Sequence, residues 1–135
     1  GATAEQVHDT ALRVLVEGLV DLGLLLGDVD GLIEQGAYRH LYMHRTGHWL
    51  GLDVHDVGAY RLGELPVTLE PGMVLTVEPG LYISDRLAVP EGQPEIDARW
   101  KGIGIRIEDD VAVTPSGHEV LTVAAQKSVA AMERS

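Results

Sequence analysis

The chain has 135 residues with 10 basic and 21 acidic side chains, which corresponds to a formal net charge of −11. Its hydrophobic content of 45% excludes an intrinsically disordered composition, and its acidity argues against a nucleic-acid partner, because phosphate binding requires clustered Lys and Arg. No apolar stretch approaches the ~18–20 residues of a membrane span, and the lack of cysteine excludes disulfides, thiolate zinc sites and cysteine nucleophiles. We therefore expect a cytoplasmic globular protein with no nucleic-acid or membrane partner.

Residues 1–36 are predicted to be helical. Apolar residues recur at helical spacing over residues 3–26, and Gly27 is expected to end this helix. Asp28 can cap a second, short helix, which Gly36 then ends.

Residues 37–135 are predicted to form mainly strands and loops, because Gly, Pro, Val, Ile and Thr become frequent there. The expected strands are residues 73–78, 102–108, 111–113 and 120–123. Residues 84–99 are predicted to form an exposed loop, and Ser128 can cap a short closing helix. Helices followed by strands indicate a single α+β domain over residues 1–135 with an antiparallel sheet.

Two predicted strand ends carry carboxylates that are candidates for chemistry. Glu78 shares a strand face with Val74 and Thr76, so it is expected to point into the protein, where a carboxylate needs a cation or a hydrogen-bond donor. Strand alternation also places Arg106 and Glu108 on one face, where they form either an ion pair or part of a metal site.

Histidines cluster between residues 40 and 56. The polar residues of this cluster are His40, His44, His48, Asp53, His55 and Asp56. The spacing of His44 and His48 suits a metal site, but no glutamate follows the first histidine, so the zincin protease motif is absent. The cluster is compatible with hydrogen-bonded imidazoles, an acid–base site or a metal site. If one histidine joins Glu78 and Glu108, such oxygen-rich ligation favours Mn, Mg or Fe over a structural zinc.

Three blocks of the chain are distinctive in wording and order. They read His-Arg-Thr-Gly-His-Trp-Leu-Gly-Leu-Asp-Val-His-Asp-Val-Gly at 44–58, Leu-Glu-Pro-Gly-Met-Val-Leu-Thr-Val-Glu-Pro-Gly-Leu-Tyr at 69–82, and Gly-Ile-Gly-Ile-Arg-Ile-Glu-Asp-Asp at 102–110. Together they resemble the aminopeptidase P and prolidase family (peptidase family M24), and the first block is closer to bacterial Xaa-Pro aminopeptidase than to the dipeptidases. The resemblance implies a pita-bread fold, in which two related α+β halves enclose a two-metal site on an antiparallel sheet.

The resemblance also implies the metal ligands, which in the family are two aspartates, one histidine and two glutamates. On this sequence His48 would be the histidine ligand, and Glu78 and Glu108 would be the two glutamates. Two divalent ions are implied. Mn²⁺ is the expected metal, with Zn, Co and Fe as alternatives.

Further roles follow from the same resemblance. Glu78 would also act as a proton shuttle beside a metal-bridging hydroxide, and His55 would stabilise the oxyanion that develops at the scissile carbonyl. His44 would line the substrate pocket. Arg106 would hold Glu108 or its neighbours in place.

The sequence also departs from the family pattern. The two aspartate ligands, which the family carries on upstream strands, have no counterpart here. We therefore expect the chain to be the C-terminal half of a pita-bread domain, inactive alone and in need of the missing N-terminal segment of the same protein. Uncovered apolar faces also lead us to expect a homo-oligomer. Near His48, Arg45-Thr46-Gly47 replaces the usual Gly-Leu-Ser or Gly-Leu-Gly.

The expected function is that of a metal-dependent exopeptidase, which removes the N-terminal residue from peptides with proline at the second position. Two alternatives remain open. One is an Xaa-Pro dipeptidase (prolidase), and the other is a pita-bread domain that has lost its metals and acts as a binding module.

Overall fold

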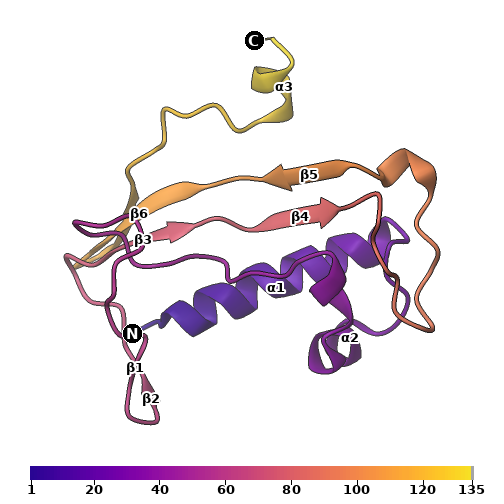
Figure 1. The fold of residues 1–135 in the computed structure, drawn as a ribbon. Coiled ribbons are helices and arrows are strands. Elements are labelled where there is room, and N and C mark those ends of the chain that lie inside the picture. Colours follow the sequence, from indigo (N-terminus) through magenta and orange to yellow (C-terminus); the bar gives the residue numbers. More distant parts are fainter. Residues whose placement is uncertain (135) are drawn as a thin grey trace. The chain divides into compact units, whose positions relative to one another are not determined.

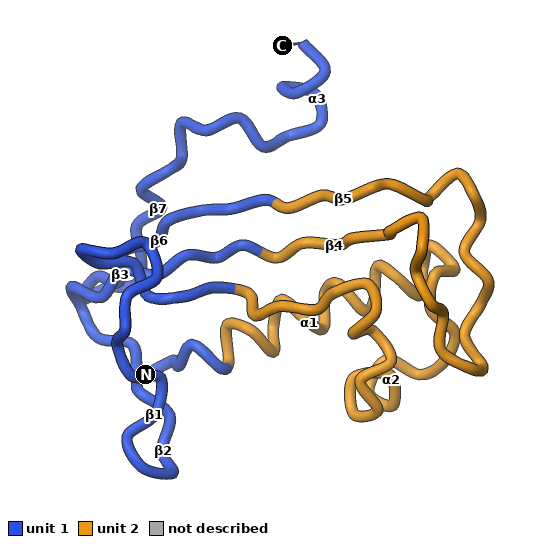
Figure 2. The backbone as a smooth tube through the Cα atoms, in the orientation of Figure 1, with its two compact units in different colours: residues 1–5, 47–78, 107–135 blue, residues 6–46, 79–106 orange. Residues whose placement is uncertain are grey.

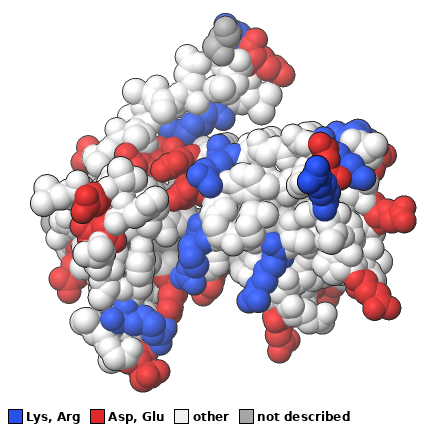
Figure 3. Space-filling model, viewed as in Figure 1, with Lys and Arg blue, Asp and Glu red and all other residues white. Residues whose placement is uncertain are grey.

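The computed structural model describes residues 1–134, which form two compact units (Figure 2). Unit 1 comprises residues 1–5, 47–78 and those from 107 onward, whereas unit 2 comprises residues 6–46 and 79–106. Helices come first and antiparallel strands follow, so the predicted α+β class is confirmed. Acidic side chains are spread over the face seen in Figure 3, with separate basic side chains between them. None of the helices within residues 1–134 has the length and apolar character that crossing a bilayer requires.

Unit 2 is built on two helices and one strand pair. Helix α1 (Ala4–Asp21) belongs to it from Gln6 onward, and α2 (Val29–Gln35) follows. Strands β4 (Gly80–Ile83) and β5 (Ile103–Arg106) pair antiparallel alongside α1 (Figure 1). Their contact buries an apolar core made of Leu12, Val16, Leu19, Leu24, Leu25, Leu32, Leu41, Tyr42 and Ile83.

The prediction of the first helix end was wrong. Helix α1 ends at Asp21, because Gly23 adopts a left-handed conformation with φ of 70°. The Gly23 N–H donates to the Val20 carbonyl at 3.0 Å, and the Leu24 N–H donates to the Leu19 carbonyl at 2.8 Å, which together form a Schellman motif. Leu24 and Leu25 lie in the turn after the helix, and both are buried in the core. The apolar pattern therefore extends beyond the end of the helix.

The second helix confirms its predicted caps. The Asp28 carboxylate accepts a hydrogen bond from the Gly31 N–H at 3.1 Å, which satisfies one of the free donors of the first turn. Gly36 ends α2 in the left-handed region with φ of 68°. The 3-10 turn η1 (Ala37–His40) follows directly.

The loop predicted over residues 84–99 contains no strand, and the 3-10 turn η2 (Ala98–Trp100) begins at its end. It is less exposed than predicted, since Leu87 and Ile96 pack against the core of unit 2. Gln93 fixes the loop through both atoms of its amide. Its Oε1 accepts from the Leu26 N–H at 2.9 Å, and its Nε2 donates to the Leu26 carbonyl at 3.3 Å.

Unit 1 contains a three-stranded antiparallel sheet in the order β3-β6-β7. Strand β3 (Val74–Val77) confirms one predicted strand. Strands β6 (Asp109–Thr114) and β7 (Gly117–Val120) form a hairpin whose loop is Pro115-Ser116. The strand expected at 120–123 was therefore placed too late, because this two-residue loop brings Gly117 opposite Thr114 and the pairing is complete at Val120.

Smaller elements complete unit 1. The two-residue strands β1 (Arg61–Leu62) and β2 (Leu65–Pro66) form a hairpin that was not predicted. Helix α3 (Val129–Met132) was predicted, and the Ser128 side chain caps it by accepting from the Ala131 N–H. The strand expected over 102–108 ends early, so Ile107 and Glu108 lie outside both β5 and β6.

Candidate metal centre

Three side chains of unit 1 converge on one point. His48, Glu78 and Glu108 each offer a ligand atom, and these three atoms lie within 4.8 Å of one another. His48 lies in an irregular segment, Glu78 follows the last residue of β3, and Glu108 precedes the first residue of β6. The structure therefore brings together the three residues that the family resemblance nominated as metal ligands.

Sheet pairing explains the convergence. Val77 pairs with Asp109 in the antiparallel β3–β6 ladder, so the residue after Val77 and the residue before Asp109 emerge from the same end of the ladder. The segment that carries His48 runs along the other edge of β3. The Thr76 N–H donates to the His48 carbonyl at 2.9 Å, and Trp49 forms a bridge with Leu75.

The imidazole of His48 is oriented by the chain that follows it. Its Nδ1 lies 2.9 Å from the Trp49 carbonyl, an acceptor, so Nδ1 carries the proton and Nε2 faces Glu78. Nε2 and Oε1 of Glu78 are 3.2 Å apart. When the imidazole is neutral, its Nε2 is a hydrogen-bond acceptor, and so is the carboxylate Oε1. Two acceptors this close need a proton or a cation between them. This arrangement fits a divalent ion, which binds neutral imidazole and carboxylate oxygen together.

Thr76 supports the other side of this contact, a role that the residue pattern did not reveal. Its side chain is buried, and its hydroxyl donates to Oε1 of Glu78 at 3.1 Å. The Thr76 hydroxyl oxygen also accepts a hydrogen bond from the backbone N–H of His48 at 3.0 Å. The available signal was strand parity, because Thr76 shares a face of β3 with Glu78.

His55 and Glu108 are the exposed members of this region. The His55 ring packs edge-on against His48, with centroids 4.4 Å apart and an interplanar angle of 76°. An exposed imidazole beside a candidate ligand can donate a hydrogen bond to a bound molecule. Asp56 has a local role, since its carboxylate accepts from the Gly58 N–H at 2.8 Å.

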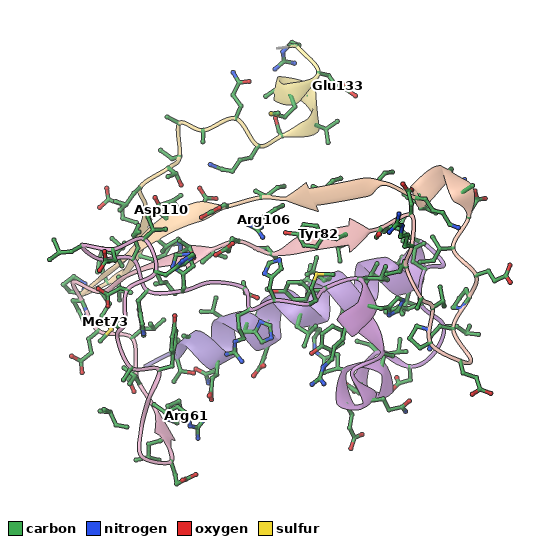
Figure 4. The ribbon with its side chains drawn as sticks, viewed as in Figure 1. Arg61, Met73, Tyr82, Arg106, Asp110 and Glu133 are labelled. Carbon is green, nitrogen blue, oxygen red and sulfur yellow. The ribbon has the colours of Figure 1, made fainter. Side chains whose placement is uncertain are left out.

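Two other predicted residues, His44 and Arg106, form a separate cluster with Tyr82 within unit 2. Arg106 and Tyr82 point toward each other from β5 and β4 (Figure 4), and the Arg106 Nε donates to the Tyr82 hydroxyl at 2.7 Å. That hydroxyl lies 3.1 Å from Nε2 of His44, whose Nδ1 bonds the Arg45 carbonyl at 2.7 Å. Tyr82 was not predicted, although it lies in the second quoted block. The assignment of Arg106 to Glu108 stays a prediction.

The unusual Arg45-Thr46-Gly47 sequence spans the boundary between the two units, and its residues make specific contacts in each of them. In unit 2, the buried Thr46 hydroxyl bonds Tyr42 at 2.6 Å and His8 at 2.8 Å. Burial, followed by the charge of Arg45, lowers the pKa of His8 below its usual value. In unit 1, a Cβ atom on Gly47 would lie 1.8 Å from the Thr76 carbonyl oxygen, so a side chain there requires the backbone to move.

His40 does not belong to either cluster. It ends the η1 turn in unit 2, and both of its ring nitrogens are buried. Burial lowers its pKa, because desolvation disfavours the charged imidazole. The histidines that cluster in the sequence therefore have different environments in the structure. His48 and His55 lie at the candidate metal centre, whereas His44 contacts Tyr82 and the ring nitrogens of His40 are buried elsewhere.

The donor set fits a divalent metal ion, and comparison with known families specifies the class of protein. Residues 1–115 match metallopeptidase family M24, so the chain belongs to that family. It is 53% identical over 133 residues to an Xaa-Pro aminopeptidase of Haemophilus influenzae, covering 98% of this chain and 29% of that protein.

Solved structures agree with this assignment. The aminopeptidase PepP of Pseudomonas aeruginosa superposes with a TM-score of 0.84 at 55% identity, covering 94% of this chain and 27% of that one. Zinc-substituted Escherichia coli aminopeptidase P superposes with a TM-score of 0.78 at 45% identity, covering 97% and 32%. The predicted pita-bread fold class is confirmed. The chain spans under a third of the length of these relatives.

Proposed function

We propose that the full-length protein is a metal-dependent exopeptidase that removes an N-terminal residue preceding proline. The observation that carries this proposal is the convergence of His48, Glu78 and Glu108 within 4.8 Å. Its specificity is suggested by relatives that are named Xaa-Pro aminopeptidases, at 53% and 52% identity. Because the chain spans under a third of those relatives, activity and substrate belong to the proposal for the whole protein.

The proposed centre holds two divalent ions. His48, Glu78 and Glu108 would supply three ligands, and two aspartates elsewhere in the full-length protein would complete the set. When bound, such ions lower the pKa of water and polarise a carbonyl oxygen. Mn²⁺ is the proposed metal, and the zinc-substituted E. coli protein supports testing Zn²⁺ beside it.

The residues of this chain would supply proton transfer and orientation. Glu78 is buried and bonded by Thr76, so its carboxylate is held in place to accept a proton from water and return it to the leaving amine. His55, exposed beside His48, would donate a hydrogen bond to the oxygen of the scissile carbonyl. His44 and Arg106 keep their predicted roles in substrate contact and support.

The test compares two glutamates that share a Glu-Pro-Gly sequence. In the Mn²⁺-loaded full-length protein, Glu78→Gln is expected to lower kcat for an Xaa-Pro-Xaa tripeptide by about 10²–10⁴-fold, the usual contribution of general acid–base catalysis. Glu70→Gln is the matched control, because Glu70 is exposed in a turn. Full activity of the Glu78 variant would contradict the proposal.

Peptide length separates the near alternative. Preference for an Xaa-Pro dipeptide over the tripeptide would indicate a prolidase, and binding of peptide without cleavage would indicate a binding module. We further propose that the 135-residue chain alone is inactive, because it supplies three ligands of the five. Cleavage by the purified chain would contradict this. The homo-oligomer and the cytoplasmic location stay predictions.

A further inference from the structure

The three candidate ligands differ in how they are held. His48 is oriented by the Trp49 carbonyl, and Glu78 accepts the Thr76 hydroxyl. Glu108 is exposed, and within residues 1–134 its carboxylate has no hydrogen-bond or ion-pair partner. It also lies between β5 and β6, outside the pairing of either strand. The residue that follows it, Asp109, is the first residue of β6 and pairs with Val77 of β3.

Asp109 is held by the chain beyond β7. Its Oδ1 accepts the Thr122 hydroxyl at 2.6 Å and the Lys127 ammonium at 2.8 Å. Lys127 also donates to the Thr122 carbonyl at 2.8 Å, and the Thr122 hydroxyl accepts the Asp110 N–H at 3.0 Å. We call Asp109, Thr122 and Lys127 the C-terminal clasp.

The clasp is a partly buried group of charge-assisted hydrogen bonds. The side chains of Lys127 and Asp109 are 25% and 26% exposed, so solvent screens their pairing only in part. The hydrogen bond from Lys127, followed by that from Thr122, lowers the pKa of Asp109. Two contacts thus hold the carboxylate of the residue next to Glu108, and both come from a segment that belongs to none of the three quoted family blocks.

We infer that Lys127 and Thr122 are positioning residues for Glu108: by fixing Asp109 they aim the Glu108 carboxylate at the metal centre. This inference rests on the proposed function, because it treats Glu108 as a ligand. In this role Lys127 and Thr122 are not ligands themselves: both act through Asp109, and Thr122 also holds the Asp110 N–H.

The charge of Lys127 allows positioning to be separated from electrostatics. Glu108, Asp109 and Asp110 are three consecutive acids, and Lys127 offsets part of their charge. By Coulomb attraction alone, removing Lys127 would strengthen cation binding at Glu108. Loss of positioning has the opposite sign and weakens binding. The direction of the change therefore decides between the two effects.

The first test measures Mn²⁺ binding to the full-length protein by calorimetry. Lys127→Met and Thr122→Val are each expected to weaken Mn²⁺ binding about 10–100-fold, the usual cost of removing a residue that orients a ligand. Lys127→Arg and Thr122→Ser keep the donors and should restore most of the affinity. Lys101→Met, at the only other lysine of the 135-residue sequence, is the matched control and should leave the Mn²⁺ affinity unchanged. Equal or tighter binding by Lys127→Met overturns the inference.

The second test needs no metal. Hydrogen–deuterium exchange of the metal-free protein should be faster over residues 106–111 in Lys127→Met and Thr122→Val, and unchanged around His48. Unchanged exchange over 106–111 overturns the inference even if the wild type binds no Mn²⁺, an outcome that would separately contradict the proposed function. If Lys127→Met fails to fold, the Thr122→Val and Thr122→Ser pair decides, since they differ by one hydroxyl.

Discussion

The Thr76 hydroxyl donates a hydrogen bond to Oε1 of Glu78 at 3.1 Å, and its oxygen accepts the backbone N–H of His48 at 3.0 Å. One buried hydroxyl thus connects two of the three candidate ligands. It restricts the Glu78 carboxylate and holds the backbone of His48 against β3. The centre is consequently organised by an uncharged side chain that no ligand motif includes.

Replacing Thr76 with valine is expected to weaken both folding and metal binding. The change removes the hydroxyl that bonds the buried Glu78 carboxylate and the part-buried His48 N–H, and the loss of these two hydrogen bonds costs about 1–3 kcal/mol of unfolding free energy. Mn²⁺ affinity should fall about 10–100-fold, because Glu78 loses its orienting donor. Urea denaturation and calorimetric titration measure the two effects. Thr76→Ser keeps the hydroxyl and should show neither.

Two glycines near the end of α1 should respond to alanine with opposite signs. Gly18 is inside the helix, and a Cβ there would meet no atom within 4 Å, so Gly18→Ala should stabilise the protein by about 0.5–1 kcal/mol. Gly23 has φ of 70°, so Gly23→Ala should destabilise it by about 1–2 kcal/mol. Urea denaturation measures both. A change of the same sign in both variants would contradict the Schellman end.

The free energy of unfolding is expected to fall on acidification. Burial lowers the pKa of His8 and His40 below their unfolded value of about 6.5, so the unfolded chain binds more protons as the pH falls below that value. Their contribution is complete above pH ~7 and is lost from pH ~6.5 downward, toward their folded pKa values.

Urea denaturation in EDTA at pH 7.5 and 5.5 tests this. His40→Gln should reduce the difference between the two pH values, whereas the control His118→Gln, at an exposed position of β7, should leave it unchanged. Greater stability at pH 5.5 than at pH 7.5 in the wild type would contradict the assignment of buried, neutral histidines.

Gln93 is expected to control the order of the loop over residues 84–99. Gln93→Ala removes both amide hydrogen bonds to Leu26, each of which contributes about 0.5–1.5 kcal/mol. Trypsin should therefore cleave faster at Arg86, an exposed residue of this loop. Gln35→Ala, at the exposed end of α2, is the matched control. Equal cleavage rates in both variants would show that other contacts hold the loop.

Some parts of the fold could be predicted because their causes are local. The caps of α2 depend on Asp28 and Gly36, which lie at its two ends and act through neighbouring backbone groups. The C-terminal end of α1 could not be read in the same way. Leu24 and Leu25 continue the apolar pattern but are buried from a turn, and only the packing of unit 2 shows this.

The same distinction applies to the candidate site. Its residue types and their alternation along β3 identified Glu78, and the quoted blocks identified His48 and Glu108. Thr76 and Thr122 escaped prediction because their partners are distant in sequence, at 28 residues for His48 and 13 for Asp109. Thr76 shares its strand face with Glu78 and Thr122 lies in a turn, but neither position distinguishes a supporting hydroxyl from that of an ordinary threonine.

By itself, then, the sequence determined the family, the α+β class and the three candidate ligands, since these depend on side-chain chemistry and short-range order. Only the tertiary structure decided that the three ligand atoms meet within 4.8 Å, that Thr76 holds two of them, and that Lys127 holds the neighbour of the third. The physical reason is that strand register and long-range hydrogen bonds set these distances, and neither is encoded in the spacing of residues along the chain.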